Sequence, residues 1–348
     1  MVTEKRGTTG NGGPAAEEPA IQGDSHTCSD ETPVPSVRFV QLSDLHLSSL
    51  ERINRTHLRG KRFLGYLSWY RKRRHEHLRS IIDTLPTVLR ELTLHQILIT
   101  GDLTHLGLPE EYAEALTWLQ HLGPPQQVMV VPGNHDIYAR GCWRNMLAAW
   151  SGYLQGDSSA TTPFPSLRVR GPVAYIGLSS GVPTPPLFAT GKLGRNQLSA
   201  LGDILDESRR LGLFRVIYLH HPPLSGVEPW RKRLVDCPQL ERVLTHHGAE
   251  LILHGHTHRS EDRIIQTRDG EAPVISQGSA SACGTHDQIA SFGEFRLFPP
   301  HTHQPYWNLF RTQWQWSRDA ACFTPATTTD WQMTRHARSP AANTADLE

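Results

Sequence analysis

Short apolar runs that end in polar residues recur along the chain and predict buried strands. The clearest of these runs are residues 36–42, 96–100, 127–131, 214–219 and 251–253. Each run is short and is followed by glycine, proline or a polar cluster, which favours a strand over a buried helix. Apolar residues at helical spacing lie in 77–94, after Pro109, in 196–210 and in 238–247. We therefore expect strands and helices to alternate through most of the chain.

The remaining apolar segments predict further strands, and two polar segments predict tails at the ends of the chain. Residues 173–178 form another expected strand, and 273–276, 292–297 and 306–316 are expected to close a second sheet. Residues 1–35 and 319–348 are polar and without periodicity, which is typical of disordered tails. The predicted organisation is one domain over residues 36–318 between these tails.

Side chains that can bind a cation stand at the ends of five predicted strands. They are Asp44 and His46, Asp102, Asn134 with His135 and Asp136, His220 with His221, and His256 with His258. Residues at i and i+2 of an extended segment point to the same side, so His256 and His258 can reach one small volume. Ligands collect at the carboxyl ends of strands in such sheets, and we expect these strand ends to face one site.

The segment 52–75 is rich in basic and aromatic residues. Residues 52–79 contain ten Lys or Arg residues and one acid, Glu76, around the aromatic patch 63–70. This pattern suits a membrane surface or an anionic, partly apolar substrate. A solvated insertion whose aromatic side chains pack on the core is the alternative, and the composition does not decide between the two.

The overall composition predicts a soluble protein of the reducing cytosol. The chain has 348 residues, of which 38% are hydrophobic and 20% charged, and it has no run of eighteen apolar residues. Its five cysteines are odd in number and include no Cys-x-x-Cys pair. The formal net charge of +1 excludes no class of partner.

The order of these strand-end motifs resembles that of the calcineurin-like metallophosphoesterases. Asp-x-His, Gly-Asp, Gly-Asn-His-Asp, His-His-Pro and Gly-His-x-His follow one another between residues 44 and 258. The resemblance implies an α+β fold, a four-layer αββα sandwich of two mixed β-sheets flanked by helices. It also implies two metal ions about 3.5–4 Å apart, a separation suited to clamping a phosphoryl group.

The resemblance assigns a ligand set by motif. The first metal takes Asp44, His46 and His258, the second takes Asn134, His220 and His256, and Asp102 bridges them. His221 is then a neighbour of the ligands, and His105 and His254 are weaker candidates for the same role. We expect the other histidines, His77 among them, to lie on the surface or to pack in the core.

The chemistry of these residue types supports a phosphoesterase. Two divalent ions bring four positive charges and the two aspartates return two negative ones, so the site stays positive and can hold a metal-activated hydroxide. Nitrogen and oxygen ligands without cysteine suit Mn, Fe, Co or Zn, and the resemblance favours Mn²⁺. His135 matches the catalytic histidine of the family, and we expect Asp136 to orient it.

The substrate is less determined than the reaction. The 52–75 segment is similar to the cap of bacterial enzymes that hydrolyse the pyrophosphate of UDP-diacylglucosamine in lipid A synthesis. It therefore favours a nucleotide-linked lipid and peripheral contact with the cytoplasmic face of a membrane. A cyclic-nucleotide phosphodiesterase, of the 3',5'-cyclic AMP type, is the alternative within the class. An inactive scaffold is the alternative of another class. A nucleic-acid substrate is disfavoured because the basic charge is confined to one segment.

Overall fold

The computed structural model describes residues 36–158, 162–284, 288–301 and 304–334. The helices in these ranges are α1 Lys61–Arg71, α2 Arg79–Glu91, α3 Pro109–Leu122, α4 Cys142–Leu154, α5 Arg195–Arg210 and α6 Cys237–His247. The strands are β1 Val37–Leu42, β2 Gln96–Ile99, β3 Val128–Val130, β4 Ser166–Arg170, β5 Val173–Gly177, β6 Phe214–Tyr218, β7 Leu251–His254, β8 Glu261–Thr267, β9 Gly270–Ser276, β10 Ser291–Phe298, β11 Tyr306–Ser317 and β12 Cys322–Thr334.

The strands form two mixed sheets. The first has the order β12-β11-β10-β1-β2-β3, and the second has the order β4-β5-β6-β7-β9-β8. The pairs β1–β2, β2–β3, β5–β6, β6–β7 and β7–β9 are parallel, and the other pairs are antiparallel. The motif strands are parallel, with β1-β2-β3 at one end of the first sheet and β6-β7 in the middle of the second, so their carboxyl ends lie along one edge of each sheet.

The apolar runs of the central strands are continuous because both faces of these strands are buried. Along β6, Val216 and Tyr218 join the core between the sheets, whereas Ile217 joins the core beneath α5 and α6. The rings of Phe39 on β1 and Tyr175 on β5 lie 5.6 Å apart, edge to face, and connect the two sheets. Each such buried side chain stabilises the fold by about 1.5–3 kcal/mol.

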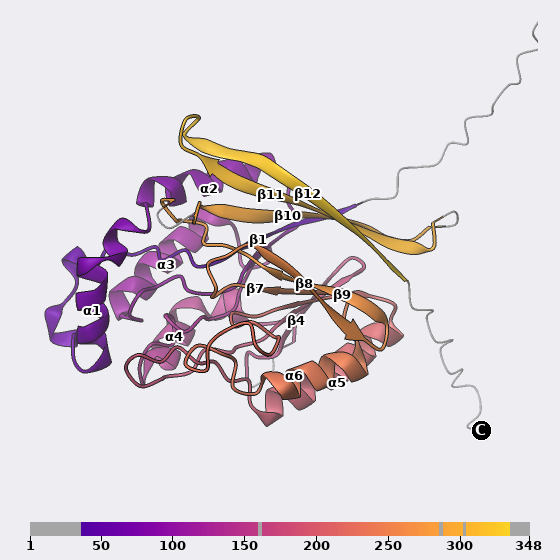
Figure 1. Ribbon diagram of the computed structural model, residues 1–348, viewed down its shortest axis with the longest axis horizontal. Helices are drawn as coiled ribbons and strands as arrows, with labels where there is room; N and C mark the ends of the chain where they lie inside the picture. Colours follow the sequence, from indigo (N-terminus) through magenta and orange to yellow (C-terminus); the bar gives the residue numbers. More distant parts are fainter. Residues whose placement is uncertain (1–35, 159–161, 285–287, 302–303, 335–348) are drawn as a thin grey trace, which may run out of the picture. The chain divides into compact units, whose positions relative to one another are not determined.

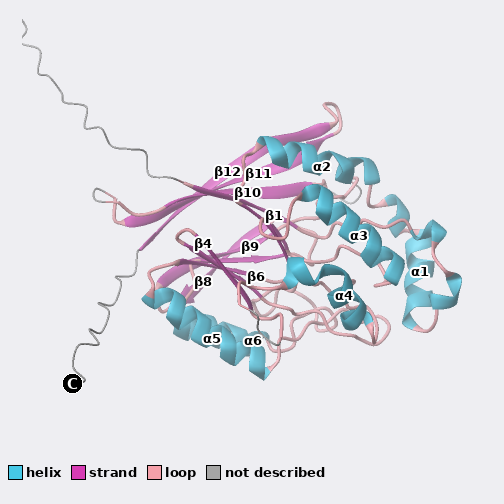
Figure 2. Ribbon diagram, turned by 180° about the vertical axis from the view of Figure 1, so that it is seen from behind, coloured by secondary structure: helices cyan, strands magenta, loops and turns pink. Residues whose placement is uncertain are grey.

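Helices cover the outer faces of both sheets, as the predicted four-layer αββα sandwich requires. Figure 2 shows α2, α3 and α4 on the side of the first sheet and α5 with α6 on the side of the second. Both views show α1 standing clear of the sheets, beside the ends of α3 and α4 (Figures 1 and 2). The predicted fold class is confirmed.

Two sequence predictions are wrong at the C-terminal side. The tail predicted from residue 319 contains β12, which pairs with β11 along its length. Segments 292–297 and 306–316, expected in the second sheet with 273–276, belong to the first as β10 and β11, because β10 pairs with β1. Apolar alternation identifies a strand but not its partner, and this explains the error. The predicted tail residues 1–35 and 335–348 lie outside the described residues.

The 52–75 segment is mostly helical. It contains α1 and the short 3-10 helices Arg55–His57 (η2) and Arg73–His75 (η3), and a third, Leu50–Arg52 (η1), precedes it. Phe63, Leu64 and Tyr70 of α1 are exposed, and Trp69 is buried. Among the described residues, no helix combines the length and apolar character needed to span a bilayer.

Candidate metal centre and reaction site

The first predicted group of ligands converges. Ligand atoms of Asp44, His46 and His258 all lie within 4.8 Å of one another. His258 Nε2 is 3.1 Å from Asp44 Oδ1. His46 Nδ1 is 3.0 Å from the carbonyl oxygen of Thr104, and because a carbonyl only accepts, the ring proton is on Nδ1. The Nε2 lone pair of His46 is therefore free to bind a cation.

The second predicted group meets at His220. Its Nε2 is 3.1 Å from Asn134 Oδ1, 3.2 Å from His256 Nδ1 and 3.3 Å from Asp102 Oδ2. His220 Nδ1 donates to the carbonyl oxygen of Thr100 at 2.8 Å, which again leaves Nε2 facing the site. The seven residues predicted as ligands thus gather in two adjacent groups.

The two groups share one carboxylate, that of Asp44. Asp44, Asp102 and His220 form a second set whose ligand atoms lie within 4.8 Å of one another. Asp44 therefore belongs to both sets, and Asp102 lies close to Asp44 and to His220. This is the arrangement that a pair of neighbouring cations requires, with anionic oxygens between them.

Backbone strain is concentrated at these positions. Eight non-glycine residues in the described part of the chain have positive φ, and five of them are predicted ligands. The five are Asp44 (51°), His46 (45°), Asp102 (58°), His256 (71°) and His258 (57°). A non-glycine residue with positive φ costs free energy, and such residues cluster at functional sites. The loops at the strand ends accept this cost and thereby aim the ligands inward.

The electrostatics of the site favour a bound cation. Burial raises the pKa of Asp44, but neighbouring histidines, chiefly His258, outweigh it and bring the pKa below its usual value. Burial lowers the pKa of His220, but Asp102 outweighs it and raises the pKa to about 9. Burial also lowers the pKa of His46 and His256, which keeps both rings neutral. The site thus holds carboxylates and neutral imidazoles, and the raised pKa of His220 indicates that positive charge is favoured at this position.

Two ligand residues of the site have a buried polar atom without a hydrogen-bond partner among the described residues. These atoms are Asp44 Oδ1 and His256 Nε2. A buried polar atom of this kind is expensive unless something else binds it. The residues present therefore fit a divalent metal centre, with nitrogen and oxygen ligands of the type that Mn, Fe, Co or Zn prefers.

The comparison with known families agrees with this geometry. The model of the calcineurin-like phosphoesterase family matches residues 37–260, more than half of the chain. The chain belongs to this family. Calcineurin-like phosphoesterases are metal-dependent, and the matched range includes every residue that we predicted as a ligand.

Two curated relatives of this calcineurin-like chain are named as cyclic nucleotide phosphodiesterases. A probable enzyme of this kind from Synechococcus sp. is 29% identical over 178 residues, which cover 49% of this chain and 61% of the relative. Another, from Rhodococcus erythropolis, is 27% identical over 201 residues, which cover 57% of this chain and 60% of the relative. The chain therefore spans about three fifths of the length of these relatives.

Solved structures support the calcineurin-like fold. A dimetal phosphatase from Danio rerio has a TM-score of 0.57 at 15% identity, with coverage of 86% of this chain and 99% of that chain. A purple acid phosphatase from yellow lupin (Lupinus luteus) seeds has a TM-score of 0.50 at 10% identity, with coverage of 85% and 54%. At these identities the likeness concerns the fold alone.

The family's expected catalytic histidine, His135, lies beside the predicted ligands, with its ring 5.0 Å from that of His46, but Asp136 does not orient this ring. His135 Nδ1 donates to the carbonyl oxygen of His105 at 2.6 Å. The Asp136 carboxylate instead accepts the backbone N–H groups of Asp102 and Gly133 at 2.8 and 2.9 Å. The prediction that Asp136 orients His135 is wrong, because the left-handed loop at Asp102 needs an acceptor for its buried N–H groups.

His77, expected on the surface or as a packing residue, packs beside the predicted ligands. The ring of His77 is 4.5 Å from that of His46 and 6.0 Å from that of His258. Burial, more than the nearby charges, lowers its pKa to about 3, and its Nδ1 is 2.7 Å from Ser281 Oγ. No strand precedes His77 in the sequence, so it lacked the signal that identified the other site histidines.

The three uncertain histidines surround the ligands in different ways. The His105 ring stacks on His46 at 4.9 Å. His221 has both ring nitrogens engaged, Nδ1 with Ser180 Oγ at 2.8 Å and Nε2 with a backbone carbonyl oxygen at 3.1 Å. His254 Nδ1 is 3.1 Å from the carbonyl oxygen of Gly255. Both ring nitrogens of His221 are thus occupied, and His221 is a neighbour of the ligands.

Two cavities, both lined in part by residues of α1, flank the centre. One, of about 530 Å³, is lined by His46, His77 and Trp69 among others. The other, of about 220 Å³, is lined by Asn134 and His135 together with residues of α1 and of the loop 186–189. The two cavities therefore offer room for the two groups that a diester carries on its phosphorus.

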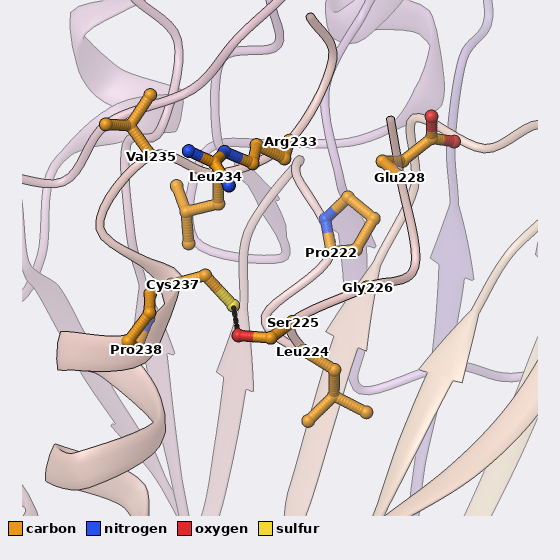
Figure 3. Close-up of a pocket in the computed structure, with 10 residues that line it drawn as sticks. All are labelled: Pro222, Leu224, Ser225, Gly226, Glu228, Arg233, Leu234, Val235, Cys237 and Pro238. Carbon is orange, nitrogen blue, oxygen red and sulfur yellow. Dashed lines mark hydrogen bonds between the residues drawn. The ribbon is translucent and has the colours of Figure 1, made fainter. Parts of the chain in front are cut away.

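A third cavity lies away from the chemistry. It measures about 120 Å³, and none of the predicted ligands or catalytic residues of the described chain lines it (Figure 3). Ser225 Oγ is 3.7 Å from Cys237 Sγ there, and burial raises the pKa of this thiol to about 11. A thiol that stays protonated at neutral pH is a poor nucleophile, so this cavity is not a candidate reaction site.

Proposed function

We propose that the protein is a dinuclear metal-dependent hydrolase that cleaves a phosphodiester or pyrophosphate bond. The observation that carries the proposal is the pair of adjacent ligand groups, built from five separate strand ends, that share the Asp44 carboxylate. Bound metal ions would supply an activated water and offset the charge that develops on phosphorus.

The residues of the chain would hold this centre and the reacting group. The two aspartates contribute only two negative charges, so the loaded centre would remain positive and attract a phosphate ester. His135 faces the smaller flanking cavity with its proton on Nδ1. Burial lowers its pKa, with Asp102 acting in the opposite direction, and the result is about 4. To protonate a leaving oxygen, His135 would first have to gain a proton at Nε2.

Two substrate classes are supported by different observations. A nucleotide-linked lipid such as UDP-diacylglucosamine is supported by the cations and the exposed apolar side chains of the 52–75 segment, beside the site. A cyclic nucleotide is supported by the names of the two curated relatives. Mn²⁺ is the proposed metal, with Fe, Zn or Co as alternatives.

The first experiment tests metal-dependent hydrolysis against the inactive scaffold. We expect the purified protein to bind divalent metal and to hydrolyse bis(4-nitrophenyl) phosphate with added Mn²⁺. Asp102→Asn should lower both metal content and turnover, because it removes a shared anionic ligand. Absence of metal and of turnover in the wild type would favour the scaffold.

The second experiment compares UDP-diacylglucosamine, cyclic AMP and bis(4-nitrophenyl) phosphate on one preparation. A kcat/KM for the lipid well above that of the other two would support the lipid-linked class, and preference for cyclic AMP would support the alternative. All three are measured with the same metal loading, so that differences report on the substrate.

Peripheral contact with the cytoplasmic face of a membrane is part of the lipid hypothesis. Arg71, Lys72 and Arg74 are exposed at the end of α1, and each would add roughly 1 kcal/mol of attraction to an anionic bilayer. Replacing the three by Gln should weaken sedimentation with vesicles that contain anionic lipid while sparing hydrolysis of the soluble diester. Unchanged sedimentation would count against membrane contact.

A further inference from the structure

Arg73, on the short helix η3, reaches into the site from the 52–75 segment. Its Nη1 is 2.9 Å from His135 Nε2. Because the proton of that imidazole is on Nδ1, Nε2 accepts and the guanidinium donates. One N–H of Arg73 is used in this way, and a guanidinium has five.

Arg73 has no acidic partner in the described part of the chain. Its neighbour Lys72 is 3.6 Å from Glu76, and Arg79 pairs with Asp83 at 2.8 Å. Arg73 is the partly buried member of the run 71–74, and the other three are exposed. An unpaired cation that faces a centre suited to divalent metals would be repelled by them. A bound anion between Arg73 and the centre would remove that repulsion.

The cavities around Arg73 indicate where such an anion would lie. Arg73 lines both the larger cavity beside His46 and the smaller one beside His135. Lys61 and Lys232 also line the smaller cavity, and no carboxylate is among its described lining residues. Three cations without an acid, next to a metal ligand, form an environment for a negatively charged group.

We propose that Arg73 is a substrate-binding residue that donates hydrogen bonds to a non-bridging oxygen of the phosphoryl group at the metal centre. The inference rests on the proposed function and names a residue that the strand-end motifs do not contain. Arginine suits this role because its planar N–H groups match the geometry of phosphate oxygens. The 52–75 segment then contributes directly to the reaction site as well as covering it.

The test measures phosphate binding to the Mn²⁺-loaded protein by calorimetry, with Arg73→Gln and the matched control Arg71→Gln. Arg71 is exposed two residues earlier and lines neither cavity. We expect Arg73→Gln to weaken binding of inorganic phosphate about 10-fold or more, which is the loss typical of a charge-assisted hydrogen bond. Arg73→Lys should fall between, and Arg71→Gln should bind as the wild type does. Metal content should be the same in all four proteins.

Kinetics with bis(4-nitrophenyl) phosphate provide the second readout. We expect kcat/KM to fall by about 100-fold in Arg73→Gln, to recover partly in Arg73→Lys and to be unchanged in Arg71→Gln. Equal phosphate affinity in Arg73→Gln and Arg71→Gln would overturn the inference while an active wild type keeps the proposed function. An inactive wild type whose phosphate affinity still depends on Arg73 would reject the function and keep the anion site. If Arg73→Gln does not fold, the comparison of Arg73→Lys with Arg71→Gln decides.

Discussion

Oδ2 of Asp136 lies 2.8 Å from the backbone nitrogen of Asp102 and connects the loops that follow β2 and β3. The same carboxylate accepts the N–H groups of Leu103 and Thr104 at 3.0 Å each through Oδ1, and that of Gly133 through Oδ2. One side chain thus satisfies the buried donors of a left-handed loop and fixes the position of Asp102, a predicted ligand.

Replacing Asp136 by Asn should loosen the centre without removing a ligand. Asn keeps one acceptor oxygen, so its NH₂ group would face backbone donors that Asp136 now satisfies. We expect a loss of about 1–3 kcal/mol in the free energy of unfolding, measured with urea on metal-free protein. Metal affinity should fall roughly 10- to 100-fold.

The control for this prediction is Asp83→Asn, because Asp83 is exposed and forms a surface ion pair with Arg79. It should change the free energy of unfolding by less than about 0.5 kcal/mol. Equal effects of the two substitutions would show that the network around Asp136 does not stabilise the loops.

The sequence predicted the parallel motif strands of both sheets and the ligand set for one physical reason. A strand buried on both faces is a continuous apolar run, and the first polar residue after it marks the edge where ligands collect. Asp44, Asp102 and His220 all stand at such points. Their convergence depends on the order of strands in space, and the motif order of a known family supplied that information.

The features that were missed lack such a signal. β12 is rich in threonine and contains Pro325, so it reads as a tail, although it is an edge strand and its proline lies at a register shift opposite Trp314. Arg73 and His77 reach the site from a helical segment, and their direction depends on how that segment packs. No spacing rule in the sequence encodes this packing.

Gly133 lies so close to Asp102 that only glycine fits there, and Gly133→Ala should disable the centre. A Cβ at this position would lie 2.1 Å from Asp102 Oδ1 and 2.6 Å from Asp102 N, distances that real contacts do not reach. The Asp102 carboxylate would have to move, so we expect metal binding to weaken and turnover of the aryl diester to fall at least about 100-fold.

Gly152 in α4 provides the matched control for Gly133. Its Cβ would meet only Pro125 at 3.4 Å, an ordinary contact. Alanine is a better helix former than glycine, so Gly152→Ala should raise the free energy of unfolding by about 0.5–1 kcal/mol and leave activity unchanged. Equal activity of the two variants would contradict the role assigned to Gly133.

Metal analysis distinguishes the roles of His254 and His258, at and after the end of β7. His258→Asn should roughly halve the bound metal, because His258 belongs to only one of the two ligand groups. His254→Asn should keep its metal, because the His254 ring contacts a neighbouring carbonyl oxygen and not the centre. Elemental analysis of both variants after loading with Mn²⁺ checks this. Similar metal loss in both would reject the assignment of His258 as the ligand.

Lys61 should make stability depend on pH above neutrality. Burial lowers its pKa to about 8, although Nζ contacts Thr184 Oγ1 at 2.6 Å and the Tyr138 ring at 4.3 Å. Between about pH 8 and the unfolded value of about 10.4, the unfolded chain binds more protons than the native protein at this side chain. The contribution of Lys61 to the free energy of unfolding therefore rises with pH across this window and is constant below it.

The comparison of wild type with Lys61→Met isolates this contribution from the other groups that titrate at high pH. Methionine keeps the apolar stem and cannot be charged. From pH 8 to 10, the free energy of unfolding of the wild type, measured with urea, should rise by on the order of 1 kcal/mol relative to that of the variant. This figure is reduced for the partial exposure of Lys61. The difference should stay constant from pH 6.5 to 7.5. A difference that is independent of pH, or that moves in the opposite direction, would mean that Lys61 stays charged in the native protein throughout this range.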